Sequence, residues 1–569
     1  MLSALGAFLH DLPVLCLFLS ILLGGFIGRL HFKGVGFGSV VGTLLGGMCV
    51  GILARPELPD LLRWVFFYLF LFAIGYSVGP QFFGSLKKAA LPQIAVTLVV
   101  AVSGVAAVLA VSAAFHFNEG LAVGLLSGGM TQSAALGTGL SAIAELPISA
   151  AAKSALMADA PLADAITYGF GDLGLILFLT WLGPKIMRAD LKRDAKAIEE
   201  QLSGGQDDGP LFSAAHFSLR AYRIENAEAA SSSLAAFEER FAAERLSVHR
   251  VQRDGERLRF GPTLALKAGD QVVISARRGA FLRAERDIGP EIDDPALLSV
   301  PVKTVAVVVT RSDVSGTTLG ALARDAQTRG VYVESLQRCT QTMPREPWTI
   351  LQRGDILRII GAPADVERAA ARIGYVERNL SATDITFLVG GICAGMLLGL
   401  LRLDAGGVLL GLGTSGSILV TGLIAGWARS RYPVLGTIPD AAQQLLMDVG
   451  LIVFIAVIGL HAGPHAVEAY KTSGGSFFAS ILVAGMIVTI VPLAAGLIVA
   501  RYALGMSPLM TLGTLAGAQT CMPGLNALRE ASGSNTVSLA YTVPYAIGNI
   551  LLTVAGPVVV AIVHSMRTP

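Results

Sequence analysis

Two long apolar segments of this chain break in the same way, and this repeat restricts the possible folds more than any other feature. Tyr68 to Phe83 reads YLFLFAIGYSVGPQFF, and Ile452 to Val467 reads IVFIAVIGLHAGPHAV. Both contain an apolar run that ends in Ile-Gly-x-x-x-Gly-Pro and continues with polar residues. Because the same unit occurs near both ends of the chain, we predict two related halves.

The composition indicates a membrane protein. Of the 569 residues, 53% are hydrophobic and only 15% are charged, and the mean hydropathy is +0.63. Soluble domains of this size do not bury that much apolar surface. A net charge of +2 gives no sign of a nucleic-acid partner. The five cysteines have no metal or redox spacing; they are Cys16, Cys49, Cys339, Cys393 and Cys521.

Ten apolar runs are long enough to cross about 30 Å of hydrocarbon. They lie near residues 12–30, 36–54, 62–83, 91–115 and 164–184, and near residues 384–402, 407–428, 443–463, 475–500 and 536–563. Each half also has an apolar segment broken by glycines and polar residues, Gly120 to Ile143 and Leu509 to Arg529. Irregular backbone persists at membrane depth only inside protein or beside a wet cavity. We therefore predict a polytopic α-helical membrane protein with an inverted repeat, in which each half has about five spans and one broken or re-entrant segment.

Basic residues orient these spans, because cytoplasmic loops are enriched in lysine and arginine. If the broken segments are re-entrant hairpins, the basic loops of both halves share one face; if the segments cross, two basic loops of the first half lie opposite the third. We favour hairpins. We expect the chain to lie in the inner membrane of a bacterial cell, with both termini outside and the central domain in the cytoplasm. The basic residues that would face the cytoplasm are Arg29, Lys33, Lys87, Lys88, Lys185, Arg188, Lys192, Arg193, Lys196, Arg429, Arg431 and Arg501, and those outside are Arg402 and Lys471.

The polar region from about Lys185 to Arg378 predicts a soluble α+β insert that is itself duplicated. Ser218 aligns with Lys303 at an offset of 85 residues, and without a gap LKAGDQVVI at 266–274 aligns with LQRGDILRI at 351–359. Each copy alternates strand and helix patterns around a Gly-Asp turn. The predicted boundaries are 1–185 for the first membrane half, 186–209 for a linker, 210–294 and 295–379 for the two soluble copies, and 380–569 for the second membrane half.

The Leu-x-x-Gly-Asp core of both copies resembles the C-terminal domain of potassium-conductance regulators, called TrkA-C. The resemblance implies domains that bind a small regulatory ligand or dimerise, so a homodimer is expected; a scaffold without a ligand is the alternative. No Gly-x-Gly-x-x-Gly follows a strand in this region of the sequence. We therefore expect no dinucleotide site and no cofactor.

Two membrane halves, each with a Gly-x-x-x-Gly-Pro span and a later broken segment, separated by two TrkA-C-like domains, resemble the aspartate:alanine exchanger family of bacterial inner membranes. The resemblance covers essentially the whole chain and implies small amino acids and dicarboxylates as substrates. It carries over no individual residue of the site. Independently, an inverted repeat with broken segments is typical of secondary transporters that work by alternating access.

The substrate is expected between the two broken segments, where helix N-termini offer partial positive charge and free N–H groups to a carboxylate. Polar packing between helices is the alternative role for these residues. Asp172 is a candidate partner for a substrate ammonium, a proton or a cation, with an outer vestibule as the alternative position. The spacing from Tyr168 to Gly183-Pro184 equals that from Tyr541 to Gly556-Pro557, which places Asp172 opposite Tyr545 and lets Tyr541 and Asn549 line the same path. The predicted substrate-binding residues are Ser127, Gly128, Gly129, Thr131, Gln132, Ser133, Gln519, Thr520, Asn526, Asp172 and Tyr545.

The two Gly-Pro spans are predicted to act through shape. Gly-x-x-x-Gly permits close helix approach and proline interrupts the backbone ladder, so these positions are structural or gating candidates: Gly75, Gly79, Pro80, Gly459, Gly463 and Pro464. Asp448 is interpreted as an interfacial residue at a helix start. His461 and His465 are expected in a loop near the outer surface.

Two other classes of function fit parts of the sequence. A proton- or cation-coupled antiporter regulated by the TrkA-C-like domains is the alternative transporter, although such proteins usually use paired intramembrane charges and here Asp172 is matched with a tyrosine. A membrane-bound ligand sensor would not need two polar breaks. The sequence shows no nucleophile with its base, no metal spacing and no phosphate loop, so we predict no enzyme activity and no metal site.

Overall fold

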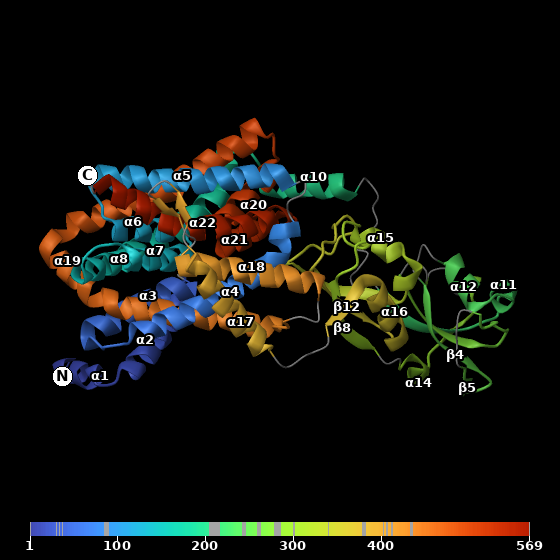
Figure 1. Cartoon of the computed structure of the whole chain (residues 1–569). Helices are drawn as coiled ribbons and strands as arrows, with labels where there is room; N and C mark the ends of the chain where they lie inside the picture. The colour runs from blue at the N-terminus through green and yellow to red at the C-terminus, as the bar shows by residue number, and fades with distance from the viewer. Residues whose placement is uncertain are drawn as a thin grey trace. The chain divides into compact units, whose positions relative to one another are not determined.

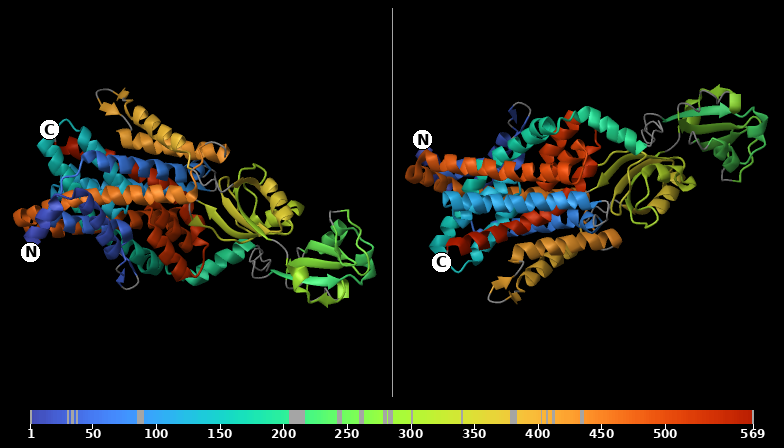
Figure 2. Two further views of the ribbon diagram at one scale, coloured as in Figure 1. Left: turned by 90° about the horizontal axis from the view of Figure 1, so that it is seen from below. Right: turned by 90° about the horizontal axis from the view of Figure 1, so that it is seen from above.

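The chain divides into two compact units, a membrane unit of Met1–Glu199 and Ser381–Pro569 and an insert of Glu200–Leu380. Figures 1 and 2 show the helices of the membrane unit and the two sheets of the insert in a computed structural model. The structure describes all residues except 1, 30, 33–34, 37, 85–89, 204–216, 242–245, 259–262, 278–280, 282–285, 300–301, 339–340, 378–382, 402, 406–407, 411–412, 433–435 and 568–569. Lys33, Lys87, Lys88, Cys339, Arg378 and Arg402 thus lie outside the described residues.

Four of the five spans predicted in the first half lie close to the observed helices. These are α2 (Pro13–Gly28), α3 (Gly38–Ala54), α4 (Asp60–Gly84) and α5 (Leu91–Phe115), and a short helix α1 (Leu2–His10) precedes them. The prediction for the fifth span was wrong at its start, because α8 (Ala150–Leu177) begins well before residue 164. Ser149 caps this helix by accepting a hydrogen bond from the Ala152 N–H, and alanines with high helix propensity fill its first turns. The helix continues through a π-helical turn, η2 (Phe178–Leu182), into α9 (Gly183–Met187).

The second half repeats this order. Its helices are α17 (Ile385–Gly399), α18 (Gly413–Arg431), α19 (Asp440–Ile498), the π-helical turn η5 (Val499–Ala503) and α22 (Val537–Arg567). Helix α19 contains two predicted spans, because its backbone leaves the helical region at Gly474 (φ 71°, ψ −178°). Beyond this point the chain runs antiparallel to α5: Gly104 faces Pro492, and Gly496 faces Val96 and Val100. Two-stranded ribbons follow α2 and α17, formed by β1 (His31–Phe32) with β2 (Val35–Gly36) and by β13 (Leu403–Ala405) with β14 (Val408–Leu410).

The helix lengths and composition confirm a polytopic membrane protein. Five described helices, α19 counted once, are long and apolar enough to span a membrane, and α2, α3 and α17 are shorter apolar helices. The two largest buried apolar clusters described in this unit lie around α5, α20 and α22 and around α4, α18 and α19, and a smaller one lies around α2, α3 and α19. The first broken segment contributes buried residues to both of the larger clusters, whereas the second contributes to the cluster around α5, α20 and α22.

The first broken segment is a re-entrant hairpin, here called hairpin 1, which comprises α6 (Glu119–Gly129) and α7 (Ser133–Glu145). Its arms are antiparallel, since a Cβ atom on Gly139 would lie 2.4 Å from the Val123 side chain. Helix α6 also runs parallel to α8: a Cβ on Gly120 would lie 2.1 Å from the Leu156 carbonyl oxygen, and one on Gly128 2.1 Å from Thr167 Oγ1. Therefore α7 returns to the end of the unit at which α6 began, as the hairpin interpretation predicts.

The second broken segment, hairpin 2, comprises α20 (Pro508–Ala518) and α21 (Met522–Ser532) and enters from the opposite end. Gly513 packs on Val537 and Gly517 on Tyr541, so α20 runs parallel to α22. Helix α21 ends just before α22 begins, and it must therefore return toward the start of α20. The two hairpins point at each other from opposite ends of the membrane unit.

Most of the described basic residues of the membrane unit lie at one end of it. We call it the insert end, because the chain leaves for the insert after α9 and returns from it at α17. The helix directions place both termini at the other end. The basic residues at the insert end lie at or near helix ends, and they include Arg29, Lys185, Arg188, Arg429, Arg431 and Arg501.

The insert contains two modules with the same topology. The first sheet has the order β5-β4-β6-β3-β7 and the second β10-β9-β11-β8-β12. The first comprises β3 (Phe217–Arg223), β4 (Ser247–Arg253), β5 (Glu256–Arg257), β6 (Gln271–Arg277) and β7 (Glu291–Ile292) with α11 (Ala227–Ala230) and α12 (Leu234–Arg240). The second comprises β8 (Lys303–Val309), β9 (Val331–Arg338), β10 (Gln341–Thr342), β11 (Ile356–Gly361) and β12 (Gly374–Glu377) with α15 (Leu319–Arg324), η4 (Ala326–Thr328) and α16 (Pro363–Ile373). Two further helices are α10 (Leu191–Ser203), which leads into the insert, and α14 (Pro295–Leu298) between the modules.

The Gly-Asp signature of each module holds a buried ion pair. Asp270 accepts two hydrogen bonds from Arg253 at 2.7 and 2.8 Å, and Asp355 accepts two from Arg338 at 2.7 and 2.6 Å. Each acid also accepts a hydrogen bond from a backbone N–H three residues earlier. All of these positions obey the 85-residue offset, so the duplication seen in the sequence is also a duplication of structure.

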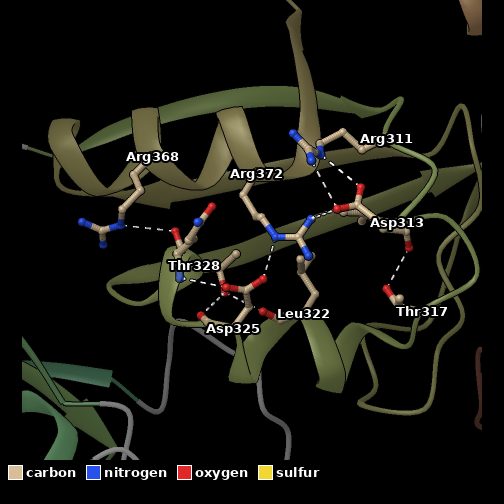
Figure 3. A network of polar contacts seen from close by, with 10 residues as sticks. Arg311, Asp313, Thr317, Leu322, Asp325, Thr328, Arg368 and Arg372 are labelled. Atoms are coloured by element: carbon tan, nitrogen blue, oxygen red, sulfur yellow. Dashed lines mark hydrogen bonds and ion pairs between the residues drawn. The ribbon is translucent and has the colours of Figure 1, made fainter.

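A wider polar network stabilises the second module. Arg372 on α16 donates to Asp325 at 2.6 Å and to Asp313 at 3.0 Å, and Arg311 also donates to Asp313 (Figure 3). These two arginines hold the pKa of Asp313 below its usual range. Through Arg372, the network links α16 to the loops that contain Asp313 and Asp325.

Candidate functional site

The tips of both hairpins have the same unusual backbone. Thr131 and Thr520 are left-handed, with φ of 54° and 55°, in a region that β-branched residues rarely adopt. The N–H groups that follow repeat one pattern: Gln132 donates to the Ser127 carbonyl at 2.8 Å, and Cys521 donates to the Ala516 carbonyl at 3.0 Å. This pattern ends one helix and lets the next begin within three residues.

The two tips touch at the centre of the membrane unit. Thr131 Oγ1 donates to the Gln519 carbonyl at 2.9 Å, which joins hairpin 1 directly to hairpin 2. Thr489 on α19 donates to the Gly129 carbonyl at 2.8 Å, and its own carbonyl lies 3.5 Å from Gln519 Nε2. Gln132, Ser133 and Gln519 are buried here, and Gln519 Oε1 has no partner among the described residues.

Each tip also contacts the long helix of the opposite half. Gln132 Nε2 lies 3.2 Å from Asn549 Oδ1 on α22, and Cys521 Sγ lies 3.6 Å from Asp172 Oδ1 on α8. Gln132 and Cys521 each follow the left-handed threonine of their hairpin. The site is therefore built twice with one geometry, but with an amide pair on one side and a thiol and a carboxylate on the other.

Packing shows which residues of α8 and α22 are equivalent. A Cβ on Gly128 would meet the Asp164 carbonyl and the Tyr168 N–H, whereas a Cβ on Gly517 would meet the Tyr541 carbonyl and the Tyr545 N–H. Asp164 therefore corresponds to Tyr541, Tyr168 to Tyr545, and Asp172 to Asn549. The predicted match of Asp172 with Tyr545 was wrong by about one helical turn. Residues four positions apart face the same side of a helix, so the sequence pattern fits both alignments.

The electrostatics of the tips suit a small polar solute. Helix α7 points its N-terminus at the cluster, and its N-cap Gln132 makes no side-chain capping bond. Helix α21 also points its N-terminus at the cluster, and its N-cap Cys521 accepts a hydrogen bond at Sγ from the Gly524 N–H at 3.3 Å. Two helix N-termini supply partial positive charge without a buried cation, while Asp172 supplies a carboxylate.

Comparison with known proteins identifies the type of molecule. Residues 16–184 and 387–561 match a family of the aspartate:alanine exchanger type, described as a predicted permease membrane region. The chain belongs to this permease family. It is 48% identical over 552 residues to an uncharacterized transporter of Bordetella bronchiseptica, with 96% of each chain covered. Uncharacterized transporters of Bradyrhizobium diazoefficiens (37% identical, 96% of this chain and 97% of that one) and Shewanella oneidensis (32% identical, 97% and 98%) are also similar. No solved structure matches.

Most of the residues predicted for the site lie at the hairpin tips of the permease. Ser127, Gly128 and Gly129 form the last turn of α6, where the Ser127 hydroxyl donates to the Gln132 carbonyl at 3.2 Å. Tyr545 lies one turn before Asn549, stacks on Tyr541 with ring centroids 5.2 Å apart, and accepts from Asn549 through its carbonyl. Asn526 does not join the cluster: it is exposed on α21, near Arg529.

The Gly-Pro spans of the permease form two matched helix contacts. A Cβ on Gly75 or Gly79 of α4 would lie 2.5 or 2.2 Å from carbonyl oxygens of α18, and one on Gly459 or Gly463 of α19 would lie 2.6 or 2.3 Å from carbonyl oxygens of α3. Pro80 and Pro464 directly follow the second glycine inside these helices. The contacts are close enough that only glycine fits.

Three outlying residues take positions that the sequence only partly predicted. His461 and His465 lie within helix α19 rather than in a loop, and His465 Nε2 lies 2.8 Å from Asp159 Oδ1 on α8. Asp448 is exposed near the start of α19 and accepts a hydrogen bond from Gln444 at 2.9 Å.

Asp164 was missed in the sequence. Its carboxyl group is fully buried beside hairpin 1, and neither oxygen has a hydrogen-bond partner among the described residues. The reason is the predicted start of the fifth span at residue 164, which placed Asp164 at the edge of the span instead of inside it. The signal that could have found it is the long, alanine-rich approach from residue 150, which already has helix-forming composition.

Proposed function

We propose that this permease is a secondary antiporter that exchanges small amino acids and dicarboxylates, with aspartate against alanine as the first pair to test. The single observation that carries the proposal is the meeting of two inverted hairpins at their tips. Because the hairpins enter from opposite ends, displacement of one tip would open the cluster toward one end while the other stays closed. That is the requirement of alternating access around a fixed site.

The groups at the tips support an amino-acid substrate. A carboxylate would accept from the uncapped N–H groups at the start of α7 and from the Ser133 hydroxyl. An ammonium group would donate to Asp172 and to Gln519 Oε1, the buried oxygen that has no partner in the described part of the chain. Both halves of a zwitterion thus find partners within one cluster, without an arginine in the membrane interior.

The alternative is a proton- or cation-coupled antiporter regulated by the insert. Asp172 favours it as an acid inside a long helix. Against it, the equivalent position on α22 is Asn549, so the acid has no second carboxylate across the pseudo-symmetry. In either case we propose that the chain lies in the bacterial inner membrane with its termini outside, that the insert modules act as TrkA-C-like domains open to a small regulatory ligand, and that the permease works as a homodimer.

Counterflow in proteoliposomes tests the exchange. Vesicles are loaded with unlabelled aspartate, alanine or succinate, and uptake of labelled aspartate is followed with and without proton or potassium gradients. We expect stimulation by an internal acid regardless of the gradients. Absence of stimulation by every acid, together with ion-driven flux in the same vesicles, would establish the alternative instead.

Two substitutions test the position of the site. Gln132→Leu should raise the KM for aspartate at least tenfold, because it removes a buried polar contact at the tip, whereas Gln444→Leu on the exposed face of α19 should not. Asp172→Asn should reduce transport of aspartate and alanine more than that of succinate, which has no ammonium group. An equal loss for all three substrates would remove Asp172 from the proposed ammonium site.

A further inference from the structure

Asp164 occupies a position where a charged group has nothing to balance it. Its backbone packs against hairpin 1, with Gly124 and Gly128 of α6 each close enough that an added Cβ would lie 2.9 Å from the Asp164 backbone. The side chain is 0% exposed, and both carboxyl oxygens lack a hydrogen-bond partner within the described residues. Ser127 is the polar side chain that interacts with Asp164, and its hydroxyl donates to the Gln132 carbonyl.

The titratable groups around Asp164 do not supply a counter-charge. Tyr168, one turn along α8, interacts electrostatically with Asp164 and also with Asp172 and Cys521. Gly124 and Gly128 of α6 pack on the Asp164 backbone, and Gly485 of α19 packs on Thr167. The basic group that α19 brings to α8 nearby, His465, is already paired with Asp159, five residues before Asp164. Each coupled group is an acid, so none of them compensates a carboxylate.

An ionised carboxylate cannot stay in such a place without a large cost. Burial of an unpaired charge costs several kcal/mol even after the surroundings relax. A metal cation would need about six oxygen ligands, whereas the neighbouring carbonyls of α6 and α8 are engaged within their helices. A proton removes the charge without any ligand, and it is the remaining solution.

The other half of the permease gives independent support. Tyr541 occupies the equivalent position behind hairpin 2 and is also fully buried. Both hairpins thus pack against a group that is uncharged when its proton is bound. A carboxyl group ordinarily loses its proton near pH 4 and a tyrosine near pH 10, so only the first half can exchange this proton in the physiological range once water reaches it.

We propose that Asp164 is a proton-binding site, protonated when hairpin 1 is packed on α8 and ionised when hairpin 1 moves away. The effect of this proton on the exchange rate rests on the proposed transporter function, whereas the protonation of Asp164 does not. Movement of hairpin 1 toward and away from α8 binds and releases one proton, and the exchange rate therefore depends on pH.

Infrared spectroscopy of the full-length permease in lipid tests the protonation without any substrate. Wild-type protein at pH 7.5 should show the band of a buried protonated carboxyl group. Asp164→Asn should lose this band, Asp164→Glu should shift it, and Asp448→Asn, which changes an exposed acid, should keep it. If Asp164→Asn does not fold, the shift in Asp164→Glu decides; an unshifted band in that variant overturns the proposal.

Transport tests the coupling. Counterflow from pH 5.5 to 8.5, with the same pH on both sides of the membrane, should show a wild-type rate that changes by up to about tenfold per pH unit where the carboxyl ionises. Asp164→Asn should give a flat profile, and Asp448→Asn should behave like wild type. A wild-type profile in Asp164→Asn would refute the coupling. If no acid is exchanged, the infrared result still stands or fails by itself.

Discussion

The insert and the membrane unit are both duplicated, but their copies have kept different properties. Both modules of the insert keep one buried ion pair, Arg253 with Asp270 and Arg338 with Asp355. Both hairpins of the membrane unit keep one backbone, while some side chains at equivalent positions differ, such as Gln132 and Cys521. A soluble module needs its stabilising contact in every copy, whereas a transport path made from two halves needs one geometry with two chemistries.

The largest effect is expected from breaking an ion pair of the insert. Asp355→Ala should destabilise the second module by about 3–5 kcal/mol, because it leaves Arg338, whose side chain is 5% exposed, buried and unpaired. Asp270→Ala should cost roughly half as much, since Arg253 is 25% exposed and can reach water. Hydrogen exchange of β8 and β11, and of β3 and β6, measures both effects in the full chain.

A double variant tests the ion pair of Arg338 and Asp355 separately from the backbone hydrogen bonds to Asp355. Arg338→Met combined with Asp355→Leu should recover most of the stability lost in Asp355→Ala, because no unpaired charge then remains. If the double variant is as unstable as the single one, hydrogen bonds from the backbone to Asp355 matter more than the arginine.

The hairpins should respond differently to the same change at Gly128 and Gly517. An added Cβ at Gly517 would lie 2.4 Å from the Tyr541 carbonyl oxygen, so Gly517→Ala must displace backbone and should cost about 3 kcal/mol. At Gly128 the nearest atom is Thr167 Oγ1, a side-chain atom. Adding Thr167→Ala should therefore rescue part of the loss in Gly128→Ala, as measured by thermal unfolding in detergent.

The contrast depends on a control in hairpin 2. Pro544 occupies the position equivalent to Thr167, with its Cβ 2.9 Å from the added atom. Pro544→Ala keeps that Cβ and leaves the Tyr541 carbonyl in place, so it should not rescue Gly517→Ala. Equal rescue in both hairpins would show that their packing is more alike than the contacts indicate.

The sequence predicted the spans and the hairpins well because membrane length and glycine interruptions leave few alternatives. It also predicted the module repeat, since the Gly-Asp turn and its buried acid recur without a gap. It missed Arg253 and Arg338 as partners of these acids, because in both modules the strand that carries the arginine pairs with its neighbour across a register shift. Register across such a shift is a tertiary property.

The site was harder to predict than the fold. Thr131, Gln132 and Gln519 could be found because small polar residues stand out in an apolar segment. The equivalence of Asp172 with Asn549 could not, because sequence spacing on a helix does not fix a shift of one turn. Only the contacts of Gly128 and Gly517 determine that register.

A smaller effect is expected from relaxing the hairpin backbones. A left-handed conformation costs a β-branched residue about 1–2 kcal/mol, which glycine does not pay. Thr520→Gly should therefore stabilise the permease by about 1 kcal/mol. Thr131→Gly should be close to neutral, because it also loses the hydrogen bond from Thr131 Oγ1 to the Gln519 carbonyl. Thermal unfolding of both variants measures the difference, and equal shifts would show that this bond contributes nothing.

The smallest effect concerns the contact between the two insert modules, where His249 lies 2.6 Å from Ser275 and 3.7 Å from Asp365. Burial lowers the pKa of His249, with Asp365 opposing this shift. The unfolded chain therefore binds more protons than the folded one as pH falls below about 6.5, so the module contact should weaken on acidification and be fully stable above that pH. Hydrogen exchange of β4 and α16 at pH 5.5 and 7.5, corrected for intrinsic rates, measures the change. In His249→Gln the protection should no longer depend on pH; a full acid response in that variant would assign the effect to another group.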